Sequence, residues 1–149
     1  MPLGPARPEG IPVGTPVPLD RMVDLNGSKF RGSDLEARSL LLVNWSPGCG
    51  YCLQIAPELA AMQSALDARG IELVLVASGS VEANEKLMGM TGLTCRIVSN
   101  DGFHPFAGLG TPIAYLVDGT GLIAAELVTG AVEVLALARD LAGRLDKQP

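Results

Sequence analysis

Aromatic and basic side chains are scarce in this sequence, and neither kind gathers in one place. Phe, Trp and Tyr make up 4% of the residues, too few for a platform on which nucleic-acid bases stack. Lys and Arg are scattered singly in a chain of net charge −5, so the basic patch of a nucleic-acid-binding protein is missing. The longest apolar runs have only the length of a buried strand. The composition therefore predicts no nucleic-acid partner and no membrane span.

Histidine and cysteine are rare as well, with one His and three Cys among 149 residues. Three cysteines do not form a framework of paired disulfides, because one is left over from any pairing. A zinc site built on a cysteine pair needs two further ligands. Cys95 and His104 are the Cys and His outside the pair, and their spacing matches no second half of a zinc knuckle. We therefore predict no bound metal.

The residues that are present predict one compact domain. Apolar residues make up 48% of the chain and charged residues 18%, which supports a buried core rather than disorder. Residues 1–16 are rich in Pro and Gly and predict an extended arm or tether, which leaves residues 17–149 as the domain. Residues 1–10 carry neither the basic nor the apolar segment of a secretory signal peptide, so composition leaves the compartment open.

Hydrophobic periodicity predicts alternating strands and helices. Asn26-Gly27 favours a hairpin turn, and Ser33 to Glu36 has the spacing of a capping box that opens a short helix. Further along, continuous apolar runs predict buried strands and apolar residues at i, i+3, i+4 and i+7 predict helices, with Ser80 as an N-cap and Gly70 as a stop. The predicted strands are 39–45, 71–78, 94–99, 113–117 and 122–128, and the predicted helices are 52–66, 81–90 and 131–145. This order predicts an α/β fold with a mixed sheet.

Cys49 and Cys52, in "NWSPGCGYC", lie where the first of these buried strands meets a helix. One helical turn places their side chains on the same face, close enough for a disulfide. Cys49 would lie at the helix N-terminus, where free backbone N–H groups and the helix dipole favour a thiolate. Cys52, one turn further in, suits a resolving role. Half of a zinc site and two buried structural thiols remain as alternative interpretations of the pair.

Two stretches carry a resemblance to a known family. "LLLVNWSPGCGYCLQIAPEL", "GTPIAYLVDGTG" and the order of elements between them resemble the thioredoxin superfamily, most closely its TlpA-type thiol–disulfide oxidoreductases. The leader "DLNGSKFRGSDLEARSLLLVNW" is similar to their N-terminal hairpin and short helix, and the resemblance covers about residues 17–146. It implies a thioredoxin-like fold, with helices flanking the mixed sheet and a β-hairpin extension.

The resemblance also implies roles for individual residues. Cys49 would be the nucleophile and Cys52 the resolving cysteine. Pro112 would be a cis-proline facing the disulfide, with the Thr111 backbone offered to an extended substrate. Trp45 would be a tryptophan packed beneath the site, and Gly50-Tyr51 would be the dipeptide that tunes the redox potential. Pro57 would be a proline that kinks the active-site helix.

This sequence departs from the family pattern at two positions. Thioredoxin has a buried aspartate where this chain has Val43, and many TlpA-type proteins have a glutamate where it has Ile55. Both positions that supply a proton acceptor for Cys52 are therefore apolar. The identity of the acceptor is left open.

The resemblance implies a thiol–disulfide oxidoreductase that reduces protein disulfides without a cofactor other than its own redox-active pair. Its partners would be protein thiols and disulfides together with an upstream membrane or soluble thiol reductant. We expect a monomer in an extracytoplasmic, periplasmic location, held through a tether.

Two other functions on the same fold remain as alternatives. A peroxiredoxin-type peroxidase has a Thr three residues before its reactive Cys, and this chain has Ser46 there. Copper-delivery relatives use Cys-x-x-x-Cys with a distant histidine, and this chain has one residue fewer between its cysteines. We expect Cys95 to be a packed free thiol, with a resolving role as its alternative, and His104 to be a solvated loop residue.

Overall fold

The computed structural model of the chain describes residues 12–17, 23, 38–46, 48–77, 80–99 and 112–143. Strand β1 (Ser39–Trp45) leads into helix α1 (Gly50–Ala68), which is followed by β2 (Ile71–Ala77) and α2 (Val81–Thr91). Strands β3 (Arg96–Ser99), β4 (Ile113–Val117) and β5 (Ile123–Thr129) then precede helix α3 (Gly130–Gly143). The predicted hairpin at Asn26-Gly27, the helix opened by Ser33, and His104 lie outside the described residues.

The five strands form one mixed sheet in the order β3-β2-β1-β4-β5. Strands β1, β2 and β3 run parallel, whereas β4 is antiparallel to both β1 and β5. Because β1 is the central strand, the site at its carboxyl end sits on the most firmly paired part of the fold. The predicted α/β class with a mixed sheet is confirmed.

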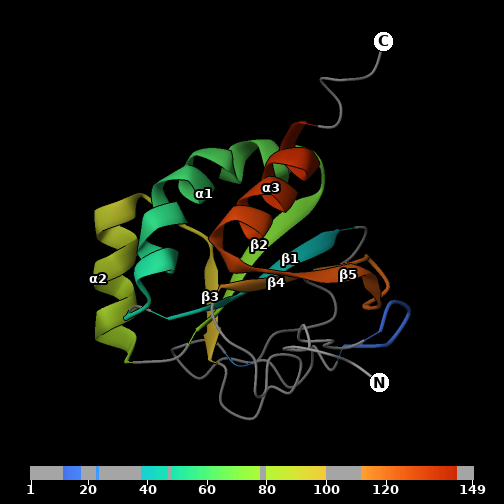
Figure 1. The fold of residues 1–149 in the computed structure, drawn as a ribbon, viewed down its shortest axis with the longest axis horizontal. Helices are drawn as coiled ribbons and strands as arrows, with labels where there is room; N and C mark the ends of the chain where they lie inside the picture. Colours follow the sequence, from blue (N-terminus) through green and yellow to red (C-terminus); the bar gives the residue numbers. More distant parts are fainter. Residues whose placement is uncertain are drawn as a thin grey trace, which may run out of the picture.

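Strand β1 is covered on both faces, as its unbroken apolar sequence predicts. Leu41, Val43 and Trp45 join a cluster with buried residues of α1, α2 and α3, and the three helices lie over one face of the sheet (Figure 1). Leu40 and Leu42 point to a second cluster on the opposite face. Alternating side chains of a single strand therefore anchor both halves of the core.

Residues 14–17 lie alongside the start of β5. The Gly14 N–H donates to the Ile123 carbonyl at 2.8 Å and the Val17 N–H donates to the Gly121 carbonyl at 2.9 Å. Val17 is buried against the second cluster. These bonds place the last residues of the predicted arm on the edge of the sheet.

Several element boundaries differ from the prediction. Strand β3 begins at Arg96 rather than 94, and β5 is shifted by one residue to 123–129. Helix α1 spans 50–68 rather than 52–66, α2 continues to Thr91, and α3 begins at Gly130 rather than 131. None of the described helices combines the length and apolarity that crossing a bilayer requires.

Candidate active site

A tight turn carries the chain from β1 to the first cysteine. The Cys49 N–H donates to the Ser46 carbonyl at 3.1 Å, and the Gly48 N–H donates to the Ser46 hydroxyl at 3.3 Å. Gly48 is exposed and Cys49 is partly exposed, so the turn brings Cys49 to the surface.

Cys49 is the N-cap of α1. Its backbone is extended, its carbonyl accepts from the Leu53 N–H at 3.1 Å, and its Sγ accepts from the Cys52 N–H at 3.3 Å. A sulfur in this position takes the place that a Ser or Asp oxygen occupies in an ordinary N-cap. Negative charge on the sulfur is favoured there by the free N–H groups and by the positive end of the helix dipole.

Cys52 differs from Cys49 in its access to solvent. It is fully buried in the cluster beneath the three helices, and Cys49 packs against that cluster from its edge. Neither cysteine forms a disulfide in this structure. An external disulfide therefore meets Cys49 first, and Cys52 lies behind it, one helical turn further along.

Trp45 belongs to the same buried cluster as Cys52. Its side chain is fully buried, and its Nε1–H finds no hydrogen-bond acceptor among the described residues. Trp45 is the last residue of β1, and Cys49 packs against the cluster to which Trp45 belongs.

Pro112 immediately precedes β4 and is buried. Its carbonyl accepts from the Gly130 N–H at 2.9 Å, which ties the start of β4 to the start of α3. Gly130 has a φ of +86°, a conformation in which a side chain is strained, so glycine suits this junction. Thr111 and the Thr111–Pro112 peptide bond lie outside the described residues.

A groove of about 690 Å³ brings Pro112 and Tyr51 together. It lies between the first turns of α1 and the β5–α3 junction. Sequence reasoning placed Tyr51 and Pro112 at the site but missed the part of the lining that comes from β5 and α3. The lining comprises Tyr51, Gln54, Ile55, Glu58, Pro112, Thr129, Gly130, Ala131, Val132, Glu133 and Leu135.

The two departures from the family pattern lie in buried surroundings. Val43 is fully buried and Ile55 is almost so, both in the cluster that holds Cys52. A carboxylate at either position would need a partner to offset its desolvation.

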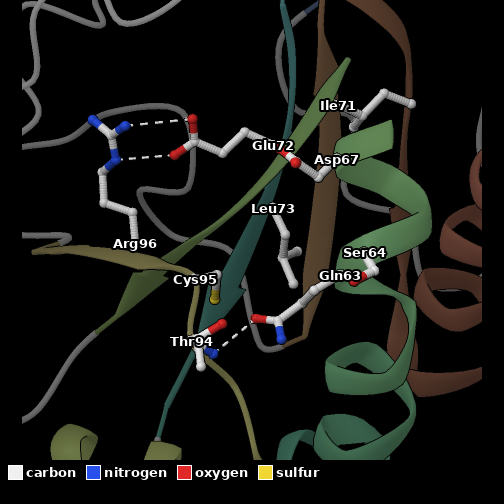
Figure 2. A pocket seen from close by; sticks show the side chains of 9 residues that line it. All are labelled: Gln63, Ser64, Asp67, Ile71, Glu72, Leu73, Thr94, Cys95 and Arg96. Carbon is white, nitrogen blue, oxygen red and sulfur yellow. Dashed lines mark hydrogen bonds and ion pairs between the residues drawn. The ribbon is translucent and has the colours of Figure 1, made fainter. Parts of the chain in front are cut away.

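The third cysteine lines a different cavity, of about 570 Å³, between α1, β2 and the segment before β3 (Figure 2). The pKa of Cys95 is raised to about 12, mainly by burial; a backbone hydrogen bond lowers it and the nearby Glu72 carboxylate makes a smaller upward contribution. Cys95 is therefore a protonated thiol at neutral pH, poorly suited to nucleophilic attack.

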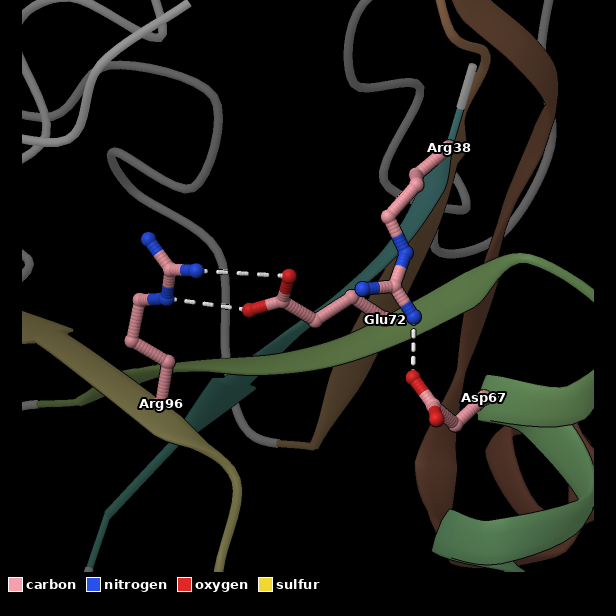
Figure 3. Close-up of polar contacts among 4 residues, drawn as sticks. All are labelled: Arg38, Asp67, Glu72 and Arg96. Carbon is pink, nitrogen blue, oxygen red and sulfur yellow. Dashed lines mark hydrogen bonds and ion pairs between the residues drawn. The ribbon is translucent and has the colours of Figure 1, made fainter. Parts of the chain in front are cut away.

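The charged groups around this cavity are already paired with one another. Arg96 Nε lies 2.9 Å from Glu72 Oε2 and its Nη2 lies 3.4 Å from Oε1, while Arg38 pairs with Asp67 (Figure 3). The Gln63 amide oxygen accepts from the Thr94 N–H at 2.8 Å, and its amide nitrogen donates to the Ala60 carbonyl. The charged and amide side chains that line the cavity are thus engaged in contacts that hold the fold together. Among the described residues, no three His, Cys, Asp or Glu side chains converge as metal ligands.

The comparisons with known proteins agree with this geometry. The curated thiol-disulfide oxidoreductase ResA of Geobacillus thermodenitrificans is 27% identical to this chain over 126 residues, covering 82% of the chain and 72% of the relative. The thioredoxin domain of a thiol-disulfide oxidoreductase from Bacteroides vulgatus has a TM-score of 0.70 and 20% identity, covering 89% of this chain and 99% of its own.

Peroxiredoxin Q of Xanthomonas campestris is also similar in fold, with a TM-score of 0.66, 13% identity and coverage of 84% of this chain and 88% of its own. At such identities the two solved structures show the fold alone. The model of the AhpC/TSA family matches residues 13–126, which is more than half of the chain. The chain thus belongs to the AhpC/TSA family, with a thioredoxin-like fold and a TlpA-type resemblance.

Proposed function

We propose that the protein is a thiol–disulfide oxidoreductase that reduces disulfides of partner proteins. One observation carries the proposal: the sulfur of the partly exposed Cys49 caps α1 and accepts from the Cys52 N–H, while Cys52 is buried one turn further along the helix. This arrangement favours one thiolate for attack from solvent and keeps a second thiol, shielded from solvent, one helical turn away.

Two exchange steps transfer two electrons from the dithiol to the partner. The Cys49 thiolate attacks one sulfur of the partner disulfide, forming a mixed disulfide and releasing the other sulfur as a thiolate that takes up a proton. Cys52 then loses its proton to solvent or to a nearby base and attacks the Cys49 sulfur. The Cys49–Cys52 disulfide forms and the second partner thiol leaves. An upstream thiol reductant restores the dithiol.

The relative ResA supports the reaction class, and the TlpA-type resemblance supports an extracytoplasmic, periplasmic location for a monomeric, tethered domain. The site residues proposed to contact the partner are Tyr51, Gly50, Thr111 and Pro112, with Trp45 supporting the turn from below. No cofactor is proposed beyond the Cys49–Cys52 pair.

Reduction of insulin disulfides with dithiothreitol as electron donor tests the proposal. Cys49→Ser is expected to lower the catalysed rate to that of dithiothreitol alone, and Cys95→Ser is expected to leave it unchanged. Catalysis that persists in Cys49→Ser would contradict the role of Cys49. Loss of catalysis in Cys95→Ser, with the fold retained by circular dichroism, would contradict the assignment of the pair.

Peroxide reduction is the second candidate, favoured by the fold shared with a peroxiredoxin. Ser46 stands three residues before Cys49, and its hydroxyl oxygen accepts from the Gly48 N–H, which leaves the hydroxyl proton available. Hydrogen peroxide consumption by the wild type, measured with a thioredoxin-type reductant that regenerates its thiols, separates the peroxidase from the disulfide reductase. Peroxide turnover faster than insulin reduction would favour the peroxidase.

A further inference from the structure

Glycine stands on both sides of the cysteine that meets solvent. Gly48 and Gly50 flank Cys49, and both glycines are exposed. Neither has a positive φ, so no left-handed backbone conformation explains the choice of glycine at these two positions.

The surrounding space does not require glycine either. A Cβ at Gly48 would lie 3.9 Å from the Ser46 hydroxyl oxygen, an ordinary van der Waals contact, and a Cβ at Gly50 would have open space within 4 Å among the described residues. Gly92 and Gly130 are different, because their φ values of +85° and +86° give glycine a role in the backbone. The two glycines beside Cys49 have no such role.

Glycine is also an unfavourable residue at the start of a helix. Gly50 is the first residue of α1, and glycine orders more backbone on folding than alanine does. A residue that local structure neither needs nor favours is expected at a functional position. Gly48 and Gly50 occupy such a position, because both adjoin Cys49.

Disulfide exchange brings a second backbone close to these glycines. The two Cα atoms of a disulfide are about 5.5–6 Å apart. Consecutive Cα atoms of one chain are about 3.8 Å apart, so the Cα of a partner cysteine bonded to Cys49 comes within a side chain's length of residues 48 and 50. Side chains at these positions would compete with the partner's backbone for space, whereas glycine leaves that space open.

We propose that Gly48 and Gly50 keep the approach to Cys49 open for disulfides held in the surface of folded proteins. A flexible disulfide can bend its flanking chain away from a neighbouring side chain, whereas a disulfide in a folded surface carries a fixed backbone on both sides. The proposal rests on the proposed disulfide reductase function and names the class of partner: a folded protein with an exposed disulfide.

A folded and a flexible disulfide are compared as oxidants of the pre-reduced enzyme. Insulin is the folded protein and oxidised glutathione is the flexible disulfide, and the second-order rate constant of each is followed by acid quenching and labelling of the remaining thiols. Gly48→Leu should lower the insulin-to-glutathione ratio of rate constants about tenfold and Gly48→Ala about twofold, because the obstruction grows with the side chain. Gly48 is varied because Gly50 belongs to the dipeptide expected to tune the redox potential.

Gly89→Leu is the matched control. Gly89 is an exposed glycine of α2 without a positive φ and with open space for a Cβ among the described residues, and it lies outside the turn that carries Cys49. This variant should keep the wild-type ratio. A ratio that falls equally in Gly89→Leu and Gly48→Leu would refute the proposal, because the effect would then not depend on the position beside Cys49.

Two further measurements separate obstruction from damage to the site. Gly48→Ala should not lower the urea unfolding midpoint, because the backbone and the space at residue 48 accept a side chain. The midpoint of the pH profile for iodoacetamide alkylation of Cys49 should be the same in Gly48→Leu and the wild type, because the bond from the Cys52 N–H to the Cys49 sulfur does not involve residue 48. A lowered unfolding midpoint or a shifted alkylation midpoint would refute the proposal, since glycine would then serve the backbone or the thiolate.

The outcomes also separate this proposal from the function on which it rests. Failure of the reduced wild type to transfer electrons to either disulfide would refute the disulfide reductase function itself. Reduction of both disulfides, with the same insulin-to-glutathione ratio in Gly48→Leu and the wild type, would refute only the open approach for folded partners.

Discussion

Three cysteines of one chain have three different environments. Cys49 is partly exposed at a helix N-terminus, Cys52 is buried one turn later, and Cys95 is partly buried in a separate cavity beside a carboxylate. Reactivity of a thiol follows the fraction present as thiolate and its access to reagents. The difference between a catalytic and an inert thiol therefore lies in the surroundings of each sulfur.

The raised pKa of Cys95 makes stability depend on alkaline pH. Unfolding returns this thiol to an ordinary pKa of 9.0, against about 12 in the folded protein. Above pH 9 the unfolded chain binds fewer protons, so stability falls as pH rises from 9 toward 12, with a limiting slope of about 1.4 kcal/mol per pH unit. Denaturant unfolding at pH 8 and pH 10 should show a larger loss for the wild type than for Cys95→Ala. Cys49 and Cys52 are present in both proteins, so their titration affects both alike. An equal loss of stability in the two proteins would contradict the raised pKa of Cys95.

Trp45 is the chain's one tryptophan and should report the redox state of the site. It shares a buried cluster with Cys52, and Cys49 packs against that cluster. A disulfide formed so close to the indole should quench its fluorescence relative to the dithiol. Emission is measured before and after reduction, with Cys49→Ser/Cys52→Ser as the control that should show no change. Unchanged emission in the wild type would place the indole away from the sulfurs.

Helix α2 offers a test at the scale of a single element. It ends at Gly92, which has a φ of +85° and whose N–H donates to the Met88 carbonyl, whereas Gly89 lies inside the helix with open space around it. Gly92→Ala should destabilise the protein by about 1 kcal/mol, because an L residue is strained in this conformation. Gly89→Ala should stabilise it by about 0.5–1 kcal/mol by restricting the unfolded chain. Urea unfolding midpoints that shift in the same direction for both variants would contradict this assignment of the helix end.

The ends of the strands show which features of the fold an apolar sequence run can predict. Strands 39–45 and 113–117 were predicted with their observed ends, because an unbroken apolar run matches burial on both faces. Strand β3 begins two residues late since the Thr94 N–H donates to Gln63 of α1, a contact between distant parts of the chain. Strand β5 begins one residue late since Leu122 forms a bridge with Pro16 instead.

Residue patterns alone could predict the candidate site only where its residues are close in sequence, and the more distant Pro112 was assigned to it through the family resemblance. Cys49 and Cys52 lie in one motif, so their spacing and the helix start were sufficient to propose the pair. The groove draws Val132 and Glu133 from the opposite end of the domain, and no local pattern joins them to Tyr51. A signal was present nonetheless, because Val132 is a large apolar residue out of phase with the buried stripe of α3.

At the scale of the whole molecule, the parallel register separates the two thiol environments. Ala77 of β2 is level with both Trp45 and Ser99, whereas Arg96 is level with Val74 and Leu42. Cys95 thus lies just before β3, four residues before the level of Trp45 at the active-site end, a separation of about 13 Å along the sheet before the turn to Cys49 is added. A disulfide requires Cα atoms within about 7 Å.

This separation predicts how a trapped intermediate behaves. In Cys52→Ser, the mixed disulfide between Cys49 and a partner should accumulate, because the buried resolving thiol is gone and Cys95 is too distant and too fully protonated to replace it. Cys52→Ser/Cys95→Ser is the matched control and should trap the same amount of complex on a non-reducing gel, with the same half-life. A complex that decays several-fold faster in the single variant would mean that Cys95 reaches Cys49. The sheet register would then have to change, because the topology keeps these sulfurs at different levels of the fold.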